Sequence, residues 1–583
     1  MSYFGIPMRN GLPLGLGSVA PLASGGGSPF SPLSLFSGGT PGAWYDPSDY
    51  GATGTLFQDS AGTTPVTAVE QPVGLMLDKS QGLVLGSELV VNGNFTSNSD
   101  WTLTASATIS GGVLNVTSAL FENFATQGSS GVIGKWYLIS LDATVTSGAF
   151  GVFVAQVTAG NKLFGNNVTT SGRKTGYVYC SSASTSFTVI LRSEGSFVGT
   201  IDNISVKELP GNHAFQATSA SRPVLSARYN LLTKTEQFDD AAWTKNSATV
   251  AANGSAWRIT DATVVASANI QQSVTVVANT PHTFQLEFEK QASGIFAIAI
   301  GNFFCYVNHA TLATFNETSF AGVNPSSSVA LVSGTQYRLT CTVTLASAGS
   351  NVRIFAALAT MSGDVNGGSN PAATGFLDVY KADFRVTNNG ITQPAYQRVN
   401  TATDYDTTGF LPYLKFDGVD DSLSTNSISF TATDKMSVFA GVRKLSDAGY
   451  AALLELSNSY DANTGTITVG YTSSFIFGSK GTVGQIASAT ALAPTSAVLT
   501  GLGDISGDRA TLRLNGTQVA QNTGDQGTGN YGNYPLYIGR RGGSSSPYNG
   551  QMYSMIIVGK AVTAGELSST ETYTASKTGV VLA

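Results

Sequence analysis

Hydrophobic and polar residues alternate in short runs along most of the chain, and these runs end at Gly, Asn, Ser or Asp. Residues 102–117 (TLTASATISGGVLNVT) and 376–386 (FLDVYKADFRV) are examples. A period of two places alternate side chains on one face of a β-strand, whereas an amphipathic helix needs a period near 3.6. The pattern therefore predicts an all-β chain of tandem β-sandwiches, and 583 residues are enough for several domains.

A longer signature occurs twice. Residues 88–101 (ELVVNGNFTSNSDW) and 230–243 (NLLTKTEQFDDAAW) each place a Phe and then an acidic residue before a final Trp. Alternating strands follow both copies, which predicts one sandwich at 86–209 and another at 229–390. Because Trp101 and Trp243 hold matching positions, we interpret both as core residues.

Composition narrows the possible functions. Only 11% of the residues are charged, against about a quarter in an average globular protein. The 30 basic and 36 acidic residues form no long run of one sign, which argues against nucleic-acid binding. No apolar stretch is long enough for a transmembrane helix, and the N-terminus lacks signal-peptide features, so synthesis in a cytoplasm is expected. Cys180, Cys305 and Cys341 are expected to be buried free thiols.

Residues 1–40 differ from the rest because prolines and glycines interrupt an apolar sequence. Such a segment forms neither a long helix nor a paired strand. Two interpretations are open, a disordered arm and an extended peptide that becomes ordered when it docks on a partner. Under the second, the anchoring side chains are Phe4, Ile6, Met8, Leu12, Leu14 and Leu16.

Residues 41–85, which contain LMLDKS, resemble a connector found near the N-termini of tail-fibre and virion-appendage proteins of tailed bacteriophages. In those proteins a GNHA-type stretch and QATSASRPVL follow directly. Here they come only at 211–225, within a continuation that we place at 210–228. The resemblance implies that 86–209 is a module inserted into a turn of the connector, which loop tips tolerate when the module's ends are close.

The two sandwich segments resemble jelly-roll carbohydrate-binding modules in their pattern. Trp136, in the apolar run KWYLISL, is interpreted as a core residue, whereas Trp257 remains a candidate for stacking on a sugar. After a linker at 391–409, residues 410–583 resemble concanavalin-A-like, laminin-G-like lectin domains. The resemblance rests on 410–424 (FLPYLKFDGVDDSLS), 436–444, 509–520 (RATLRLNGTQVA) and 534–567, which occur in the family's order.

Lectin-type sandwiches bind ligands at loops or on a concave sheet. Three long polar stretches of the last unit are candidate binding loops: 457–465, 521–534 and 540–550. They carry Tyr460, Tyr531, Tyr534 and Tyr548 among Gly, Ser and Asn, a mixture typical of stacking anchors with adaptable hydrogen bonding. Replacing the last three tyrosines by Ala is expected to leave thermal stability nearly unchanged. Arg540 and Arg541 are either contacts to anionic sugars or solvated strand ends.

Catalytic signals are weak. No two carboxylates are placed as glycoside hydrolysis requires, and His213, His282 and His309 are scattered outside any Ser/His/Asp arrangement. Asp417, Asp420 and Asp421 could offer oxygen ligands to calcium, but the FDG turn of this family is usually structural and the spacing is not that of an EF-hand. We therefore predict neither enzymatic activity nor a cofactor.

Together these features predict a bacteriophage virion protein, foremost a tail fibre or receptor-binding appendage that displays sandwiches for host adsorption. A head fibre or capsid-decoration protein is the alternative, and a glycan depolymerase is disfavoured. The expected partners are a bacterial surface glycan and, through the arm, other virion proteins of the tail, portal/adaptor or capsid. A homotrimer is expected, with no membrane insertion; the expected location is the virion, assembled in the host cytoplasm.

Overall fold

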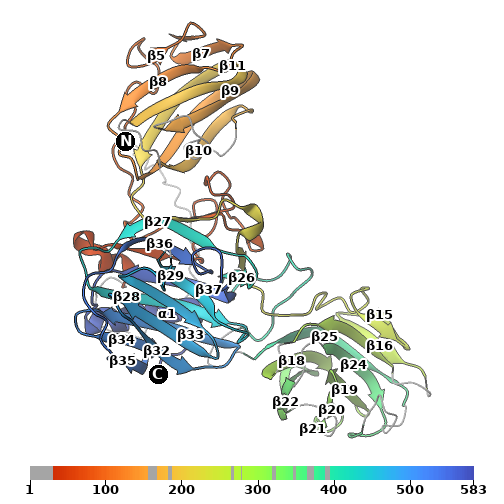
Figure 1. The fold of residues 1–583 in the computed structure, drawn as a ribbon. Helices are drawn as coiled ribbons and strands as arrows, with labels where there is room; N and C mark the ends of the chain where they lie inside the picture. Colours follow the sequence, from red (N-terminus) through yellow and green to blue (C-terminus); the bar gives the residue numbers. More distant parts are fainter. Residues whose placement is uncertain are drawn as a thin grey trace, which may run out of the picture.

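The computed structural model describes residues 30–154, 167–180, 187–263, 268–276, 279–317, 323–345, 350–363, 373–387, 394–457 and 459–583. These residues are almost entirely β, as the alternating pattern predicts, and they form three bodies of antiparallel strands (Figure 1). The arm residues Phe4, Ile6, Met8, Leu12, Leu14 and Leu16 lie outside the described residues. Among the described residues, no helix combines the length and apolarity needed to cross a membrane.

The C-terminal sandwich consists of two nine-stranded sheets. Sheet I has the order β3 (Gln71–Pro72), β13 (Val224–Ser226), β26 (Tyr413–Asp417), β37 (Asn549–Val558), β28 (Lys435–Lys444), β33 (Thr495–Asp504), β34 (Arg509–Leu514) and β35 (Thr517–Asn522), with β1 (Gly42–Tyr45) also paired to β37. Sheet II has the order β2 (Leu56–Phe57), β4 (Leu75–Met76), β12 (Ala214–Phe215), β27 (Leu423–Ser429), β36 (Asn533–Ile538), β29 (Ala451–Leu456), β30 (Thr466–Tyr471), β31 (Ser474–Lys480) and β32 (Gly484–Thr490).

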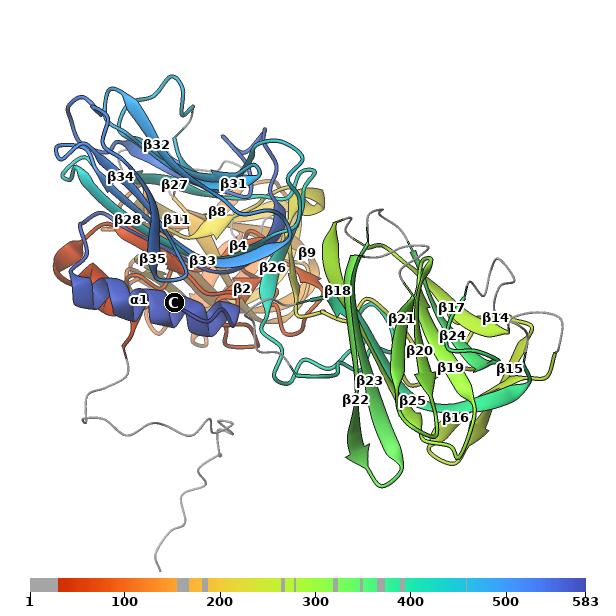
Figure 2. The ribbon, with the colours of Figure 1, turned by 90° about the horizontal axis from the view of Figure 1, so that it is seen from below.

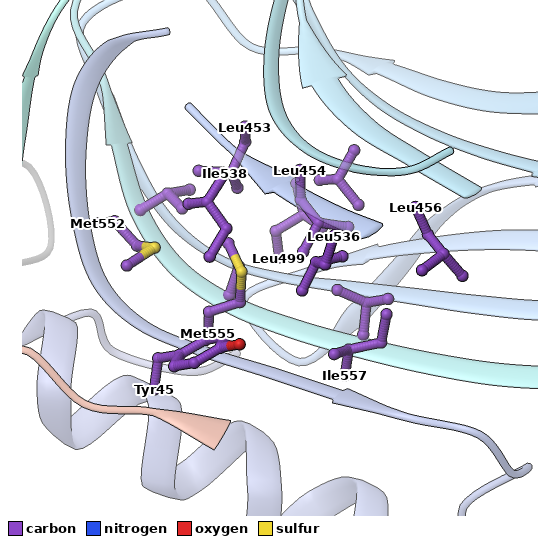
Figure 3. Packing of buried hydrophobic residues seen from close by; sticks show 14 of the residues in the cluster. Tyr45, Leu453, Leu454, Leu456, Leu499, Leu536, Ile538, Met552, Met555 and Ile557 are labelled. Atoms are coloured by element: carbon purple, nitrogen blue, oxygen red, sulfur yellow. The ribbon is translucent and has the colours of Figure 1, made fainter. Parts of the chain in front are cut away.

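The connector is part of this sandwich and not a separate unit. Strand β1 pairs with β37 in the register Trp44↔Ile556, and β13 pairs with β26 in the register Leu225↔Leu414. Tyr45 is fully buried in the core between the sheets, beside residues such as Met555 (Figure 3). The sandwich that contains the predicted lectin-like unit, 410–583, therefore also includes strands contributed by residues hundreds of positions earlier.

The chain leaves the C-terminal sandwich to form each of the other two sandwiches, and it returns each time to a strand next to the one that it left. Around 86–209, β4 and β12 pair as Ala214↔Met76, and Asp78 Oδ2 accepts a hydrogen bond from the Asn212 amide at 2.7 Å. This is the geometry that an insertion requires. The second sandwich is likewise enclosed, since the chain leaves after β13 and returns at β26, which pairs with it. The sequence pattern predicts a sandwich at 229–390 that follows the connector, but it does not predict this enclosure.

The first sandwich is a seven-stranded sheet around one core. Its strands are β5 (Thr102–Leu103), β6 (Ala107–Ser110), β7 (Val113–Ser118), β8 (Asn123–Ser129), β9 (Trp136–Val154), β10 (Gly172–Tyr179) and β11 (Phe187–Glu208). Trp136 is buried, as predicted, but outside this core: its ring lies 5.3 Å from His213 and 5.7 Å from Phe215 of the connector. The insert is thus packed on its host sandwich by aromatic contacts as well as joined to it.

The second sandwich has two six-stranded sheets. One has the order β14 (Thr244–Asn246), β17 (Asn269–Val274), β24 (Ser350–Leu358), β19 (Ile295–Ile300), β20 (Phe303–Asn308) and β21 (Thr314–Glu317). The other has the order β15 (Ala248–Asn253), β16 (Ala256–Asp261), β25 (Gly375–Val386), β18 (Thr280–Glu289), β23 (Gln336–Leu345) and β22 (Val323–Ser333).

The repeated signature marks the same core site in both inserted sandwiches. Trp101 and Trp243 are buried, and each ring packs on the Phe of its signature, with centroids 5.5 and 5.2 Å apart. Each indole N–H donates to the backbone carbonyl nine residues earlier, at 3.2 and 3.1 Å. The prediction that both are core residues is confirmed, as is the prediction that all three cysteines are free and buried.

The outer face of sheet I is covered by two helical segments, the 3-10 segment η1 (Pro32–Gly39) and the helix α1 (Ala564–Thr578), which Figure 2 shows lying along the sheet. Leu35 and Phe36 of η1 are buried against Phe439 and Ile556. Part of the predicted arm, residues 30–40, is therefore packed on its own chain, because its large apolar side chains find a sheet face there. A short 3-10 turn, η3 (Ser219–Ser221), completes the described helical segments.

Candidate functional site

Two of the predicted loops, 457–465 and 540–550, meet on the outer face of sheet II around a buried carboxylate. Glu455 of β29 points away from the core that holds its neighbours Leu454 and Leu456. Its Oε2 accepts from Arg541 Nε at 2.9 Å, and its Oε1 accepts from the Tyr460 amide at 3.1 Å. Burial raises the pKa of the Glu455 carboxyl, and Arg541 opposes that rise.

Arg541 extends from this buried contact toward solvent. Its Nη1 lies 3.4 Å from Asp461 Oδ2, and the Asp461 side chain is 81% exposed. The guanidinium also lies 5.5 Å from the ring centroid of Tyr450 and 5.7 Å from that of Tyr460, within the range of cation–π attraction. The result is a solvent-facing ion pair bordered by aromatic rings.

Glycines and a lysine fix the tyrosines around this pair. A Cβ on Gly470 would lie 2.9 Å from the Tyr450 ring, and a Cβ on Gly478 would lie 2.7 Å from the Tyr460 hydroxyl. Only glycine lets the rings lie this close to the sheet. Lys480 Nζ donates to the carbonyls of Tyr460 and Asp461, each at 2.9 Å, and so holds the loop in place.

We name this region the Arg541 surface; it comprises Tyr450, Glu455, Tyr460, Asp461, Lys480, Tyr537 and Arg541. Tyr537 belongs to it because its register position on β36 is opposite Glu455, so both side chains share the outer face. The exposed Asp461 carboxylate can accept hydrogen bonds and the Arg541 guanidinium can donate them, while the half-buried rings of Tyr450 and Tyr537 offer apolar area.

The structure brings together only part of the predicted site. Tyr460 and Arg541 meet, and Tyr534 reaches the same loop by donating to the Thr464 carbonyl at 3.0 Å. Arg540 is half-buried and donates to the Ser544 carbonyl. Trp257 lies on the second sandwich, half-buried, with its indole N–H donating to the Glu236 carbonyl at 2.8 Å.

Tyr531 and Tyr548 are corrections to the sequence-based site. Both side chains are 1% exposed and belong to the core between the sheets. The Tyr531 hydroxyl bonds to Ser479 Oγ at 2.7 Å, and the Tyr548 ring packs edge-on against Tyr471 at 5.4 Å. Tyr460, at 7% exposure, also presents little of its ring to solvent. The loops are polar along their length but turn these rings inward, so they cannot serve as exposed stacking anchors.

Sequence reasoning missed Tyr450, Glu455, Asp461, Lys480 and Tyr537. One available signal was the lone acidic residue in the apolar strand AALLEL, since a buried carboxylate requires a charged or hydrogen-bonding partner. The partner, Arg541, lies 86 positions away in sequence, so the pairing itself could not be derived from local pattern.

The acidic cluster of the FDG turn is brought together, with ligand atoms of Asp417, Asp420 and Asp421 all within 4.8 Å of one another. Asp417 Oδ1 accepts from the amides of Val419 and Asp420 at 2.8 and 3.2 Å, which is the structural role expected of this turn. Burial, followed by the neighbouring carboxylates, raises the pKa of Asp421 to about 7.

The three histidines hold backbone segments in place. His213 Nδ1 accepts from the Asp78 amide at 2.9 Å, and His282 Nδ1 lies 3.0 Å from the Thr280 carbonyl. Burial lowers the pKa of His213 to about 3 and that of His309 to about 4, and it also lowers the pKa of His282. All three are therefore neutral near pH 7.

Residues 417–568 match the model of the Concanavalin A-like lectin/glucanases superfamily, and this part of the chain is a concanavalin A-like domain. The described strands extend the same sandwich to β1–β4, β12 and β13, outside the matched range. A comparison with curated proteins found no significant match.

Solved structures similar to parts of the chain include carbohydrate-binding proteins. The CBM40 of the Ruminococcus gnavus IT-sialidase bound to alpha2,3 sialyllactose is 14% identical over 25% of this chain and 97% of that one, with TM-score 0.21. A putative carbohydrate binding protein from Bacteroides ovatus ATCC 8483 is 12% identical over 52% and 78%, with TM-score 0.22. The NanB sialidase from Streptococcus pneumoniae is 15% identical over 26% and 27%, with TM-score 0.21, so the alignment spans about a quarter of that enzyme.

Proposed function

We propose that the protein is a glycan-binding structural protein of a bacteriophage virion, most specifically a tail fibre or receptor-binding appendage, and that the Arg541 surface contacts the glycan. The observation that carries the binding part is the exposed Asp461–Arg541 pair beside tyrosines on a lectin-type sheet. Carboxylates and guanidinium groups hydrogen-bond to sugar hydroxyls, and neighbouring aromatic rings favour the apolar faces of sugar rings.

The virion part rests on the resemblance of 41–85 and 211–225 to phage connector segments. Under this proposal the residues before η1 anchor the chain to other virion proteins, and a homotrimer supplies several copies of each glycan site. Weak single sites then act together, because a second contact on the same particle is effectively intramolecular.

The proposal assigns no catalytic step to the Arg541 surface. Glu455 has no exposed surface, and both of its carboxylate oxygens already accept hydrogen bonds from the chain. Glycoside hydrolysis needs two carboxylates that reach the scissile bond, and Asp461 alone extends into solvent here.

Adsorption of the purified full chain to bacterial cells and to a glycan array tests the binding part. Asp461→Ala should weaken binding by at least about tenfold, since a charge-assisted hydrogen bond is worth about 1.5–3 kcal/mol. Asp239→Ala, which removes an exposed carboxylate from the second sandwich, is the matched control and should bind as the wild type does. Equal binding by both variants would reject the Arg541 surface as the glycan site.

Antibody labelling of purified particles tests the virion part. Label at the tail supports the fibre assignment, and label on the capsid would replace it with the head-fibre or decoration alternative. Particles without label would overturn the virion role altogether.

A further inference from the structure

A cavity of about 530 Å³ lies between the C-terminal sandwich and the second sandwich. Its volume falls within the range of about 300–1,000 Å³ that is usual for small-molecule sites, which often lie between domains. One wall is the outer face of sheet I, where β13, β26, β28 and β37 contribute residues, and the other wall contains Ser273–Thr275 and Val386. In Figure 1, β26 lies on the side of the C-terminal sandwich that faces the second sandwich.

Positive charge predominates in this cavity. Arg228, Lys415 and Arg443 line it together with a single carboxylate, Glu70, although the whole chain has a formal charge of −6. Glu70 Oε1 already accepts hydrogen bonds from the hydroxyls of Ser226 and Tyr405. The carboxylate is thus engaged within the chain and leaves a cationic excess in the cavity.

Two of these cations, Arg228 and Lys415, are open to a ligand. The Arg228 guanidinium donates only to backbone carbonyls, those of Asn230, Leu231 and Leu232 at 3.0–3.2 Å, and among the described residues it forms no ion pair. Lys415 is exposed and likewise forms no ion pair with a described residue. A ligand carboxylate could therefore bind without displacing an internal salt bridge.

The remaining lining suits a sugar ring. Tyr229 and Tyr413 meet edge-on at 5.8 Å and form a rigid apolar base. Thr275 is an exposed residue, and Gln551, whose Oε1 accepts from Tyr553, has amide N–H groups that donate to no described residue. Apolar walls with a few polar groups and a cationic cluster match a small, hydroxyl-rich acid.

We propose that this cavity binds a monosaccharide-sized sugar acid of the uronic acid class, gripped between the second sandwich and the C-terminal sandwich. The site is separate from the Arg541 surface and does not depend on the function proposed for it. Occupancy would also couple the two sandwiches, because both contribute lining residues.

Calorimetric titration of the full chain with glucuronic acid tests this proposal, with glucose as the neutral counterpart. Glucuronic acid should bind, more weakly at high salt, and glucose should give no detectable binding. Lys415→Gln, which removes one cation, and Thr275→Trp, which fills the rim from the opposite sandwich, should each weaken binding about tenfold. Circular dichroism and thermal unfolding confirm that both variants are folded.

Two control variants change residues outside this cavity. Lys207→Ala removes a half-buried lysine on the first sandwich, and Asp239→Ala removes an exposed carboxylate of the second sandwich that does not line the cavity; both should bind glucuronic acid as the wild type does. Equal affinity for glucose and glucuronic acid, wild-type affinity in folded Lys415→Gln and Thr275→Trp, or equally strong competition by inorganic phosphate would each overturn the sugar-acid site.

Discussion

Tyr548→Ala tests whether the polar loop 540–550 is anchored in the core. The side chain is 1% exposed, its ring packs edge-on against Phe416 at 5.6 Å, and its hydroxyl donates toward the carbonyls of Arg443 and Gln551 at 3.1 and 3.0 Å. Truncating a buried aromatic residue costs about 3–5 kcal/mol, from lost burial and from the cavity that remains. At about 2–4 °C per kcal/mol for a domain of 150–250 residues, the unfolding temperature should fall by about 6–20 °C.

Differential scanning calorimetry of the full chain measures this change in the transition of the C-terminal sandwich. Tyr548→Phe keeps the ring and loses only the hydroxyl's hydrogen bonds, so it should cost about 1 kcal/mol. Tyr534→Ala is the control, because that ring is half-buried and its hydroxyl bonds to an exposed loop. If Tyr548→Ala unfolded at the wild-type temperature, the assignment of this ring to the core would be wrong.

Three further predictions concern domain boundaries and pH. Excising 86–209 should leave a folded but less soluble protein, because the β4–β12 pairing remains while the apolar surface beneath Trp136 becomes exposed. A circular dichroism spectrum that shows loss of the C-terminal sandwich would contradict this prediction. Deleting 1–29 should block incorporation into virions without changing the unfolding temperature. Deleting 1–40 should in addition lower the free energy of unfolding by about 2–5 kcal/mol, because buried Leu35 is lost. Equal unfolding temperatures for the two deletions would contradict this stabilising role of residues 30–40. The pKa of Asp421 is about 7 in the folded chain and about 4 in the unfolded chain. Between about pH 4 and pH 7 the folded state therefore keeps a proton that the unfolded state has released, so the free energy of unfolding falls as pH rises. Asp421→Asn should flatten this pH dependence in denaturation curves, and an unchanged slope would refute it.

The candidate site was only partly predictable, and the reason differs for each tyrosine. Loop composition predicted a site at 457–465 and 540–550, and Tyr460 and Arg541 of these two loops do meet. Composition does not indicate which way a ring points, because a Gly- and Asn-rich loop can turn either outward or back into the sandwich. Tyr531 and Tyr548 turn inward since the space between the sheets admits them and supplies partners for their hydroxyls.

By itself the sequence determined local structure: the period of two set the strands, and the Phe/Trp signature set a core site in both inserted sandwiches. It also determined the FDG turn, whose Asp417 carboxylate bonds to amides only two and three residues away. Only the tertiary structure decided that the connector belongs to the lectin-type sandwich and that both other sandwiches are enclosed by it. Those facts depend on pairings such as Trp44↔Ile556 and Leu225↔Leu414, in which the connector strands have only four and three residues and are too short to be recognised alone. Local alternation fixes which side chains share a face, but the partner of an edge strand is chosen by the burial that the whole chain achieves.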